Sequence, residues 1–132
     1  MLNERGSINN RKRAEQQIDY KGLLYGNITP TDIDGLIKYH NKGYVILEAK
    51  LKETLLLKSQ RLALERMTDD LSKTGKSTIC IIVRHEIDDP KQDIDATKTT
   101  VREYRWLGEW HFPKDICNTK DMIDWFIQRL DT

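Results

Sequence analysis

Three side chains on two neighbouring segments have the types and the spacing to build a metal site. Asp34 stands at the start of the apolar run IDGLIKY, and Glu48 and Lys50 close the run YVILEAK. Side chains two apart in an extended strand project from the same face, so Glu48 and Lys50 share one. Two carboxylates near each other repel unless a cation lies between them, and a neighbouring lysine can stabilise charge that develops on a substrate.

The segment between these runs predicts how Asp34 would meet Glu48. The runs 33–39 and 44–50 are separated by HNKG, which is typical of a β-hairpin turn. If the strands pair through a turn near Asn41, residues whose numbers sum to about 82 or 83 lie opposite each other, which sets Asp34 opposite position 48 or 49. Mg²⁺ prefers such oxygen ligands, and Mn²⁺ is expected to replace it. The backbone carbonyl of Ala49 would add a third oxygen, and Lys50 would orient a water.

The remaining elements frame this hairpin. A sparse apolar pattern predicts a helix over residues 9–25, and an amphipathic pattern predicts one over 55–73 that ends at Gly75. STICIIVRH (77–85) predicts a buried strand, residues 86–99 an exposed loop, 100–110 a strand, and the segment after Asn118 a closing helix. The order indicates one α/β or α+β domain over 1–132 around a mixed sheet, with residues 1–8 flexible.

Composition excludes several classes of protein. The chain has 132 residues, with 22 Lys plus Arg against 21 Asp plus Glu, so any nucleic-acid contact must come from local clusters. The cysteines, Cys80 and Cys117, have no zinc spacing and suggest a reducing, cytoplasmic setting. No apolar run approaches membrane-spanning length, so no membrane partner is expected.

The pattern D-x13-E-x-K, placed on a hairpin, resembles the PD-(D/E)xK nuclease superfamily, and in particular small phage and archaeal enzymes of the Holliday-junction-resolvase and VRR-NUC types. Gln60 lies ten residues after Lys50, where a helix of such enzymes often presents a glutamine, and TGKSTICIIV follows that helix. The resemblance spans roughly residues 13–84. Pro30 is not adjacent to Asp34, because Ile33 takes the preceding place.

The resemblance implies a restriction-endonuclease-like αβββαβ core and a Mg²⁺-dependent endodeoxyribonuclease that acts as a homodimer and is structure-specific, cutting junctions or flaps or nicking DNA. Asp34, Glu48 and the Ala49 carbonyl would hold the metal, together with an acid of the first helix, Glu15 or Asp19, of which Glu15 is preferred. Lys50 would orient the attacking water, and Gln60 would support the site or touch the substrate. Small size and resemblance suggest a phage or mobile-element origin.

Plainer interpretations stand beside these. Asp34, Glu48 and Lys50 can form a solvated cross-strand ion pair of little energetic value. Gln60 is equally well a polar residue at a helix edge, and the aromatic side chains Trp106, Trp110 and Trp125 can stack on bases or fill a core. The fold can also serve a non-catalytic module that binds nucleic acid or protein. A third alternative is a plain interaction protein that binds no divalent metal.

Overall fold

The structure is a computed structural model that describes residues 16–132, and the chain divides into two units, residues 1–31 and 32–132. Residues 16–31 contain no helix and a single isolated bridge, between Tyr25 and Ile28. The predicted helix over 9–25 is therefore wrong for 16–25, while its first residues and the segment 1–8 lie outside the described residues. Ile18 is 74% exposed, and a helix without a packed apolar face is marginal in water.

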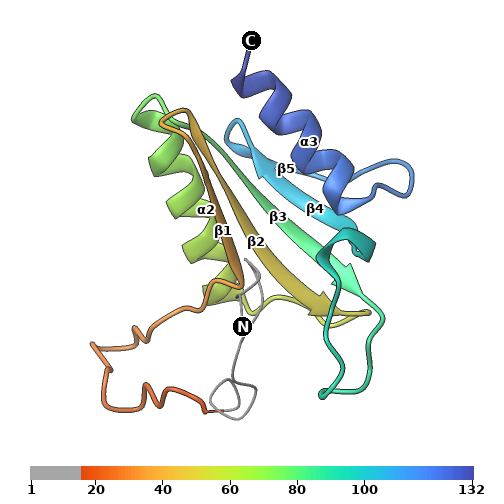
Figure 1. The fold of residues 1–132 in the computed structure, drawn as a ribbon. Helices are drawn as coiled ribbons and strands as arrows, with labels where there is room; N and C mark the ends of the chain where they lie inside the picture. The colour runs from red at the N-terminus through yellow and green to blue at the C-terminus, as the bar shows by residue number, and fades with distance from the viewer. Residues whose placement is uncertain (1–15) are drawn as a thin grey trace, which may run out of the picture. The chain divides into compact units, whose positions relative to one another are not determined.

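The second unit is an α+β fold built on a mixed sheet, as expected, and the sheet has five strands (Figure 1). Its elements in chain order are β1 (Gly35–Tyr39), β2 (Gly43–Leu51), α2 (Lys58–Lys73), β3 (Ser77–His85), a short 3₁₀ helix η1 (Ala96–Lys98), β4 (Thr100–Trp106), β5 (Glu109–His111) and α3 (Thr119–Leu130). The strands lie in the order β1-β2-β3-β4-β5; β2 and β3 are parallel and the other pairs antiparallel. Among the described residues two strands precede α2, where an αβββαβ order has three.

The β1–β2 hairpin has the predicted register. Gly35 pairs with Leu47 and Tyr39 with Gly43, so the paired numbers sum to 82. His40 adopts a left-handed φ of 52° in the turn, and the Lys42 amide donates to the Tyr39 carbonyl. Asp34, one residue before β1, consequently stands opposite Glu48.

The two helices cover opposite faces of the sheet. On one face, Phe126 of α3 packs against Val45 of β2 and against Ile79 and Ile81 of β3. On the other face, Leu64 of α2 packs against Ile46 of β2 and against Cys80 and Ile82 of β3. Both faces of β3 are thus buried, which explains its continuous apolar sequence. Because faces alternate along β2, Glu48 and Lys50 project on the α2 side.

Several boundaries differ from the predicted ones: β1 begins at Gly35 rather than at 33, and β2 extends one residue beyond 44–50 at each end. The start of α3 and the last residue of α2, Lys73, are confirmed. The segment 100–110 is a hairpin, since Leu107 and Gly108 both have positive φ and turn β4 into β5. Helix α2 begins at Lys58 rather than at 55, and its C-cap is Thr74, with the left-handed Gly75 directly after it. Helix α3 starts as predicted, because the Asn118 side chain accepts from the amides of Lys120 and Asp121.

Candidate metal and phosphodiester site

Asp34 is anchored to the strand that carries the other candidate ligands. Its Oδ2 accepts a 2.8 Å hydrogen bond from the Ala49 amide, across the position where β1 begins. The N–H and C=O groups of one strand residue point to the same side of the strand, so the Ala49 carbonyl also faces the side of β2 on which Asp34 lies. Asp34, Glu48 and Ala49 therefore come together as the sequence predicts.

Glu48 is the buried centre of this group, with 4% of its surface exposed. Its Oε1 accepts a 2.9 Å hydrogen bond from Nε2 of Gln60 and lies 3.8 Å from Nζ of Lys50. Its Oε2 is buried and receives no hydrogen bond from a neighbouring donor, and the Glu48 carboxyl lies within hydrogen-bonding reach of the Asp34 carboxylate. Gln60 reaches Glu48 because it lies in the first turn of α2, on the helix face that packs against the sheet.

The electrostatics of the group disfavour a charged Glu48. Burial raises the pKa of its carboxyl above the ordinary value, and the nearby Asp34 carboxylate raises this pKa further. Lys50 and the hydrogen bond from Gln60 lower the pKa without cancelling the rise. A cation bound beside Oε2 would offset the repulsion between the Glu48 and Asp34 carboxylates.

These donors fit a hard divalent cation. Oε2 of Glu48 needs a partner, Asp34 supplies a second carboxylate, and the Ala49 carbonyl is a neutral oxygen of the kind that Mg²⁺ accepts. Within residues 16–132 no three or more His, Cys, Asp and Glu side chains gather in a metal-binding group. A third carboxylate would have to come from elsewhere.

The two acids weighed for that role differ in position. Glu15 lies outside the described residues. Asp19 lies in the irregular segment 16–31, where its carboxylate accepts from the Lys21 amide. Asp32, which the sequence sets near Asp34, is exposed.

A second buried acid on the same face of the sheet is absent from the sequence predictions. Glu103 of β4 is 7% exposed and pairs with Arg61, the residue next to Gln60. Both glutamates flank Ile82, which pairs with Glu48 on one side and with Glu103 on the other. Strict alternation would place Glu103 on the face of Val101, but a register shift between Ile82 and Val83 turns it to the other face. No sequence signal marks that shift.

His85 and Trp110 lie at two different places on the sheet. His85 ends β3 and lines, with Asp34 and Ala49, an open and mainly apolar hollow of about 380 Å³. Trp110 is half-buried on the α2 side, where its Nε1 donates to Glu65 and the Arg61 guanidinium lies 4.2 Å from its ring centroid.

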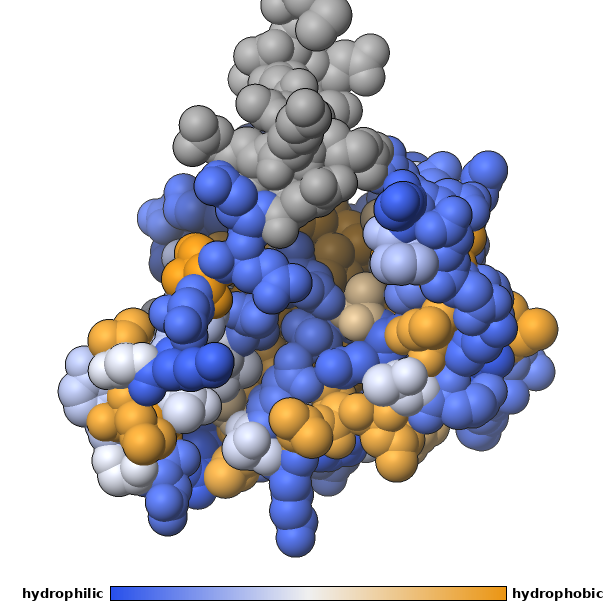
Figure 2. Space-filling view, turned by 90° about the horizontal axis from the view of Figure 1, so that it is seen from below, coloured by the Kyte–Doolittle hydropathy of each residue, from blue (hydrophilic) through white to orange (hydrophobic). Residues whose placement is uncertain are grey.

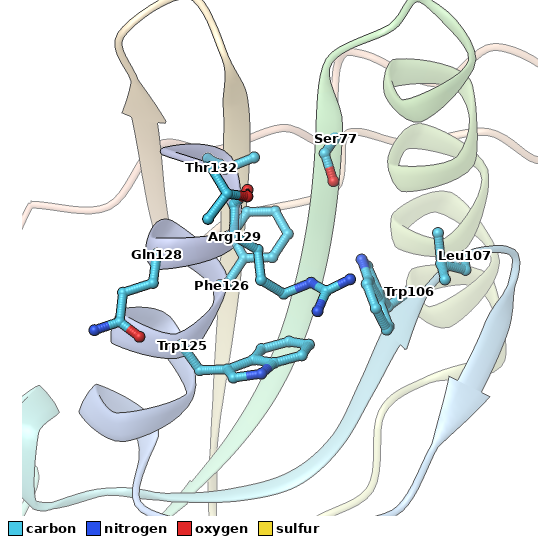
Figure 3. A pocket seen from close by; sticks show the side chains of 9 residues that line it. Ser77, Trp106, Leu107, Trp125, Phe126, Gln128, Arg129 and Thr132 are labelled. Carbon is cyan, nitrogen blue, oxygen red and sulfur yellow. The ribbon is translucent and has the colours of Figure 1, made fainter.

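Trp106 and Trp125 form an edge-to-face pair, with ring centroids 5.2 Å apart, in a hollow of about 580 Å³ between β4 and α3 (Figure 3). The Arg129 guanidinium lies 5.1 Å from both ring centroids and points between the rings. Trp125 is 39% exposed, so its indole remains accessible for contacts. This hollow lies at the Ser77 end of β3, away from Glu48.

No family model matches the chain, and no curated protein or solved structure is significantly similar to it. The resemblance to the nuclease superfamily therefore rests on the site residues. Within the described residues no helix is long and apolar enough to cross a membrane.

Proposed function

We propose that this chain is a metal-dependent nuclease of the PD-(D/E)xK type, with a restriction-endonuclease-like core, that hydrolyses phosphodiester bonds in DNA. The observation that carries the proposal is the buried Oε2 of Glu48, which lacks a hydrogen-bond partner beside the Asp34 carboxylate. A buried carboxylate oxygen without a partner is costly unless a proton neutralises it or a cation binds it, and a cation would serve both carboxylates at once.

Each candidate residue has its own role in the proposed reaction. Asp34, Glu48 and the Ala49 carbonyl would hold Mg²⁺, with Glu15 as the fourth candidate ligand. When bound, the metal supplies a water of lowered pKa and neutralises the phosphate. Lys50, whose Nζ lies 3.8 Å from Oε1 of Glu48, would orient the attacking water and stabilise the negative charge that develops on the phosphate. Gln60 fixes Glu48 through Oε1, and Oε2 would remain available to hold a cation.

A cleavage assay on plasmid, flap and four-way-junction DNA tests this proposal. We expect cleavage with Mg²⁺ or Mn²⁺ that EDTA abolishes, and a Lys50→Ala variant slowed by at least about 100-fold, as for loss of a charge-stabilising group. Lys38→Ala, an exposed lysine of β1, is the matched control and should retain the parent rate. Equal rates for the two variants would refute the assigned role of Lys50.

A non-catalytic module on the same fold is the second candidate. It is favoured by one observation, the pair of carboxylates where the described residues offer no third. Calorimetry with Mn²⁺ on the parent and on Glu48→Ala separates metal-binding proteins from a plain interaction protein. DNA binding without cleavage in the assay above would select the module. Sedimentation with and without DNA would test the expected homodimer.

A further inference from the structure

The hollow between β4 and α3 contains a buried hydrogen-bond donor that the fold leaves unsatisfied. Nε1 of Trp106 is buried and has no hydrogen-bond partner within residues 16–132. A buried indole N–H usually finds an acceptor, because a hydrogen bond left unmade at a buried position is costly. An acceptor supplied by a bound ligand would remove this cost.

Arg129 brings a second donor group without an acceptor. Its side chain is exposed, and its guanidinium lies 5.1 Å from the ring centroids of both Trp106 and Trp125 (Figure 3). No carboxylate in the described part of the chain pairs with it. A cation over an aromatic ring at an exposed site is held only weakly. The guanidinium can therefore leave the rings when an anion is offered.

The acids near the hollow do not supply that anion. Asp124 of α3 is paired with Lys120, and Asp131 accepts a hydrogen bond from Lys42. Glu109, which pairs in register with the last residue of β4, does not line the hollow. The last turn of α3 carries the negative end of the helix dipole, and the arginine in that turn offsets it. The side chains that line the hollow thus carry one charge, which is positive.

The shape of the hollow suits a small flat ligand. Its volume of about 580 Å³ lies in the range of small-molecule sites. The rings of Trp106 and Trp125 meet at 78° and give it aromatic walls, and Ser77 and Gln128 add neutral polar groups. Aromatic walls favour a planar ring, and the unpaired donors favour a ring that carries acceptors.

The hollow is separate from the candidate metal site. Ser77 begins β3, and Ile82, five positions later, pairs with Glu48, which corresponds to roughly 16 Å along the strand. The hollow also lies on the α3 side of the sheet, whereas Glu48 projects on the α2 side. Figure 2 looks at the other end of the sheet, where apolar side chains appear among mainly hydrophilic ones. A ligand in the hollow would therefore not touch the metal site.

We propose that this hollow is a binding site for a nucleoside monophosphate. The base takes the place of the guanidinium against the two indole rings and accepts a hydrogen bond from Nε1 of Trp106, while Arg129 turns to pair with the phosphate. A purine supplies a flat face and ring-nitrogen acceptors together, and a guanidinium binds phosphate oxygens in a bidentate manner. The site needs no metal and is independent of the proposed nuclease activity.

The test titrates AMP, adenosine and inorganic phosphate into the protein in EDTA and follows the indole N–H signals by ¹H–¹⁵N NMR. The chain has three tryptophans, so a Trp→Phe variant at each position assigns the three signals. Trp106→Phe and Arg129→Ala probe the two donors. Trp110→Phe is the control, because Nε1 of Trp110 already donates to Glu65 on the α2 side.

We expect AMP to shift the signals of Trp106 and Trp125, with Trp106 moving downfield, and to leave that of Trp110 in place. AMP should bind at least about tenfold more tightly than adenosine, because the phosphate adds a charge-assisted pair. Arg129→Ala should bind the two ligands equally. Trp106→Phe should weaken both by at least about fivefold through loss of one hydrogen bond, and Trp110→Phe should match the parent.

Unmoved signals of Trp106 and Trp125 at millimolar AMP would overturn the proposal, and so would equal affinities of the parent for AMP and adenosine. A single-stranded tetranucleotide that binds more than about tenfold more tightly than AMP would also overturn it, since the hollow would then belong to a longer strand-binding path. If Trp106→Phe does not fold, Trp125→Leu removes the partly exposed ring and should weaken both ligands. None of these results bears on cleavage, so the nuclease proposal stands or falls separately.

Discussion

The side-chain amide of Gln60 donates to Oε1 of Glu48 at 2.9 Å and leaves the other oxygen of that carboxylate buried without a partner. The two residues are 12 apart in sequence and join the first turn of α2 to the end of β2. A negative charge introduced at position 60 would therefore become part of the candidate metal site.

Gln60→Glu would add a third carboxylate to this group. Without metal we expect a Tm several degrees below that of the parent, because like charges at a buried position repel. With Mn²⁺ the variant should gain more Tm than the parent, since binding to the folded state stabilises it. Thermal melts in EDTA and in a Mn²⁺ series measure both effects. A Tm that Mn²⁺ raises equally in variant and parent would place Gln60 outside the metal site.

Glu48→Gln removes the buried charge and retains an acceptor for Gln60. The folded state raises the pKa of Glu48, so it binds this proton more tightly than the unfolded state does. The contribution to stability is thus present at acidic pH and is lost as pH rises from the ordinary glutamate pKa through the raised one. In EDTA at pH 7.5 we expect Glu48→Gln to have a higher Tm than the parent by a few degrees, and a smaller difference at pH 4.

Two measurements complete that prediction. Mn²⁺ should raise the Tm of the parent and leave Glu48→Gln nearly unchanged. Glu53→Gln, whose side chain is 84% exposed, serves as the control and should follow the parent in both experiments. A lower Tm for Glu48→Gln at pH 7.5 would contradict the assigned cost of the charge.

Asp69→Asn tests the pairing that holds α2 to β4. The Arg105 guanidinium makes two hydrogen bonds to Asp69, of 3.0 and 2.6 Å, and lowers the pKa of that carboxyl. Stability from this pair is present above the ordinary aspartate pKa and is lost as pH falls through the lowered value. We expect urea unfolding to show a loss of about 1–2 kcal/mol at pH 7 and little difference at pH 2. Asp70→Asn, next to it but 76% exposed, should cost almost nothing.

The hairpin and the buried strand could be predicted because their causes are local. Residues 40–43 contain a turn that fixes the register, and the alternation along β2 then places Glu48 and Lys50 on one face. The continuous apolar run of β3 gives its bounds, Ser77 and His85, without error. Asp34 and Glu48 meet as predicted because the hairpin fixes their register, whereas Gln60 reaches Glu48 from a helix that begins three residues later than predicted.

Other features depend on contacts that a sequence pattern does not encode. The predicted helix over 16–25 fails because its apolar residues find no packed face, and the β4–β5 hairpin was hidden because Leu107, rather than the usual asparagine or aspartate, precedes Gly108 in the turn. The ion pair of Glu103 with Arg61 depends on a shifted register between β3 and β4. That shift follows from how the strands pack.

Cys80 lies fully buried beneath α2, and burial raises the pKa of its thiol to about 12. Because the thiolate is the reactive form, alkylating reagents can reach this sulfur only when the helix lifts from the sheet. Cys117 is partly exposed and gives a second labelling rate in the same sample. The alkylation rate of Cys80 therefore reports how often α2, which carries Gln60, detaches from the sheet. A cation bound at the site should lower this rate.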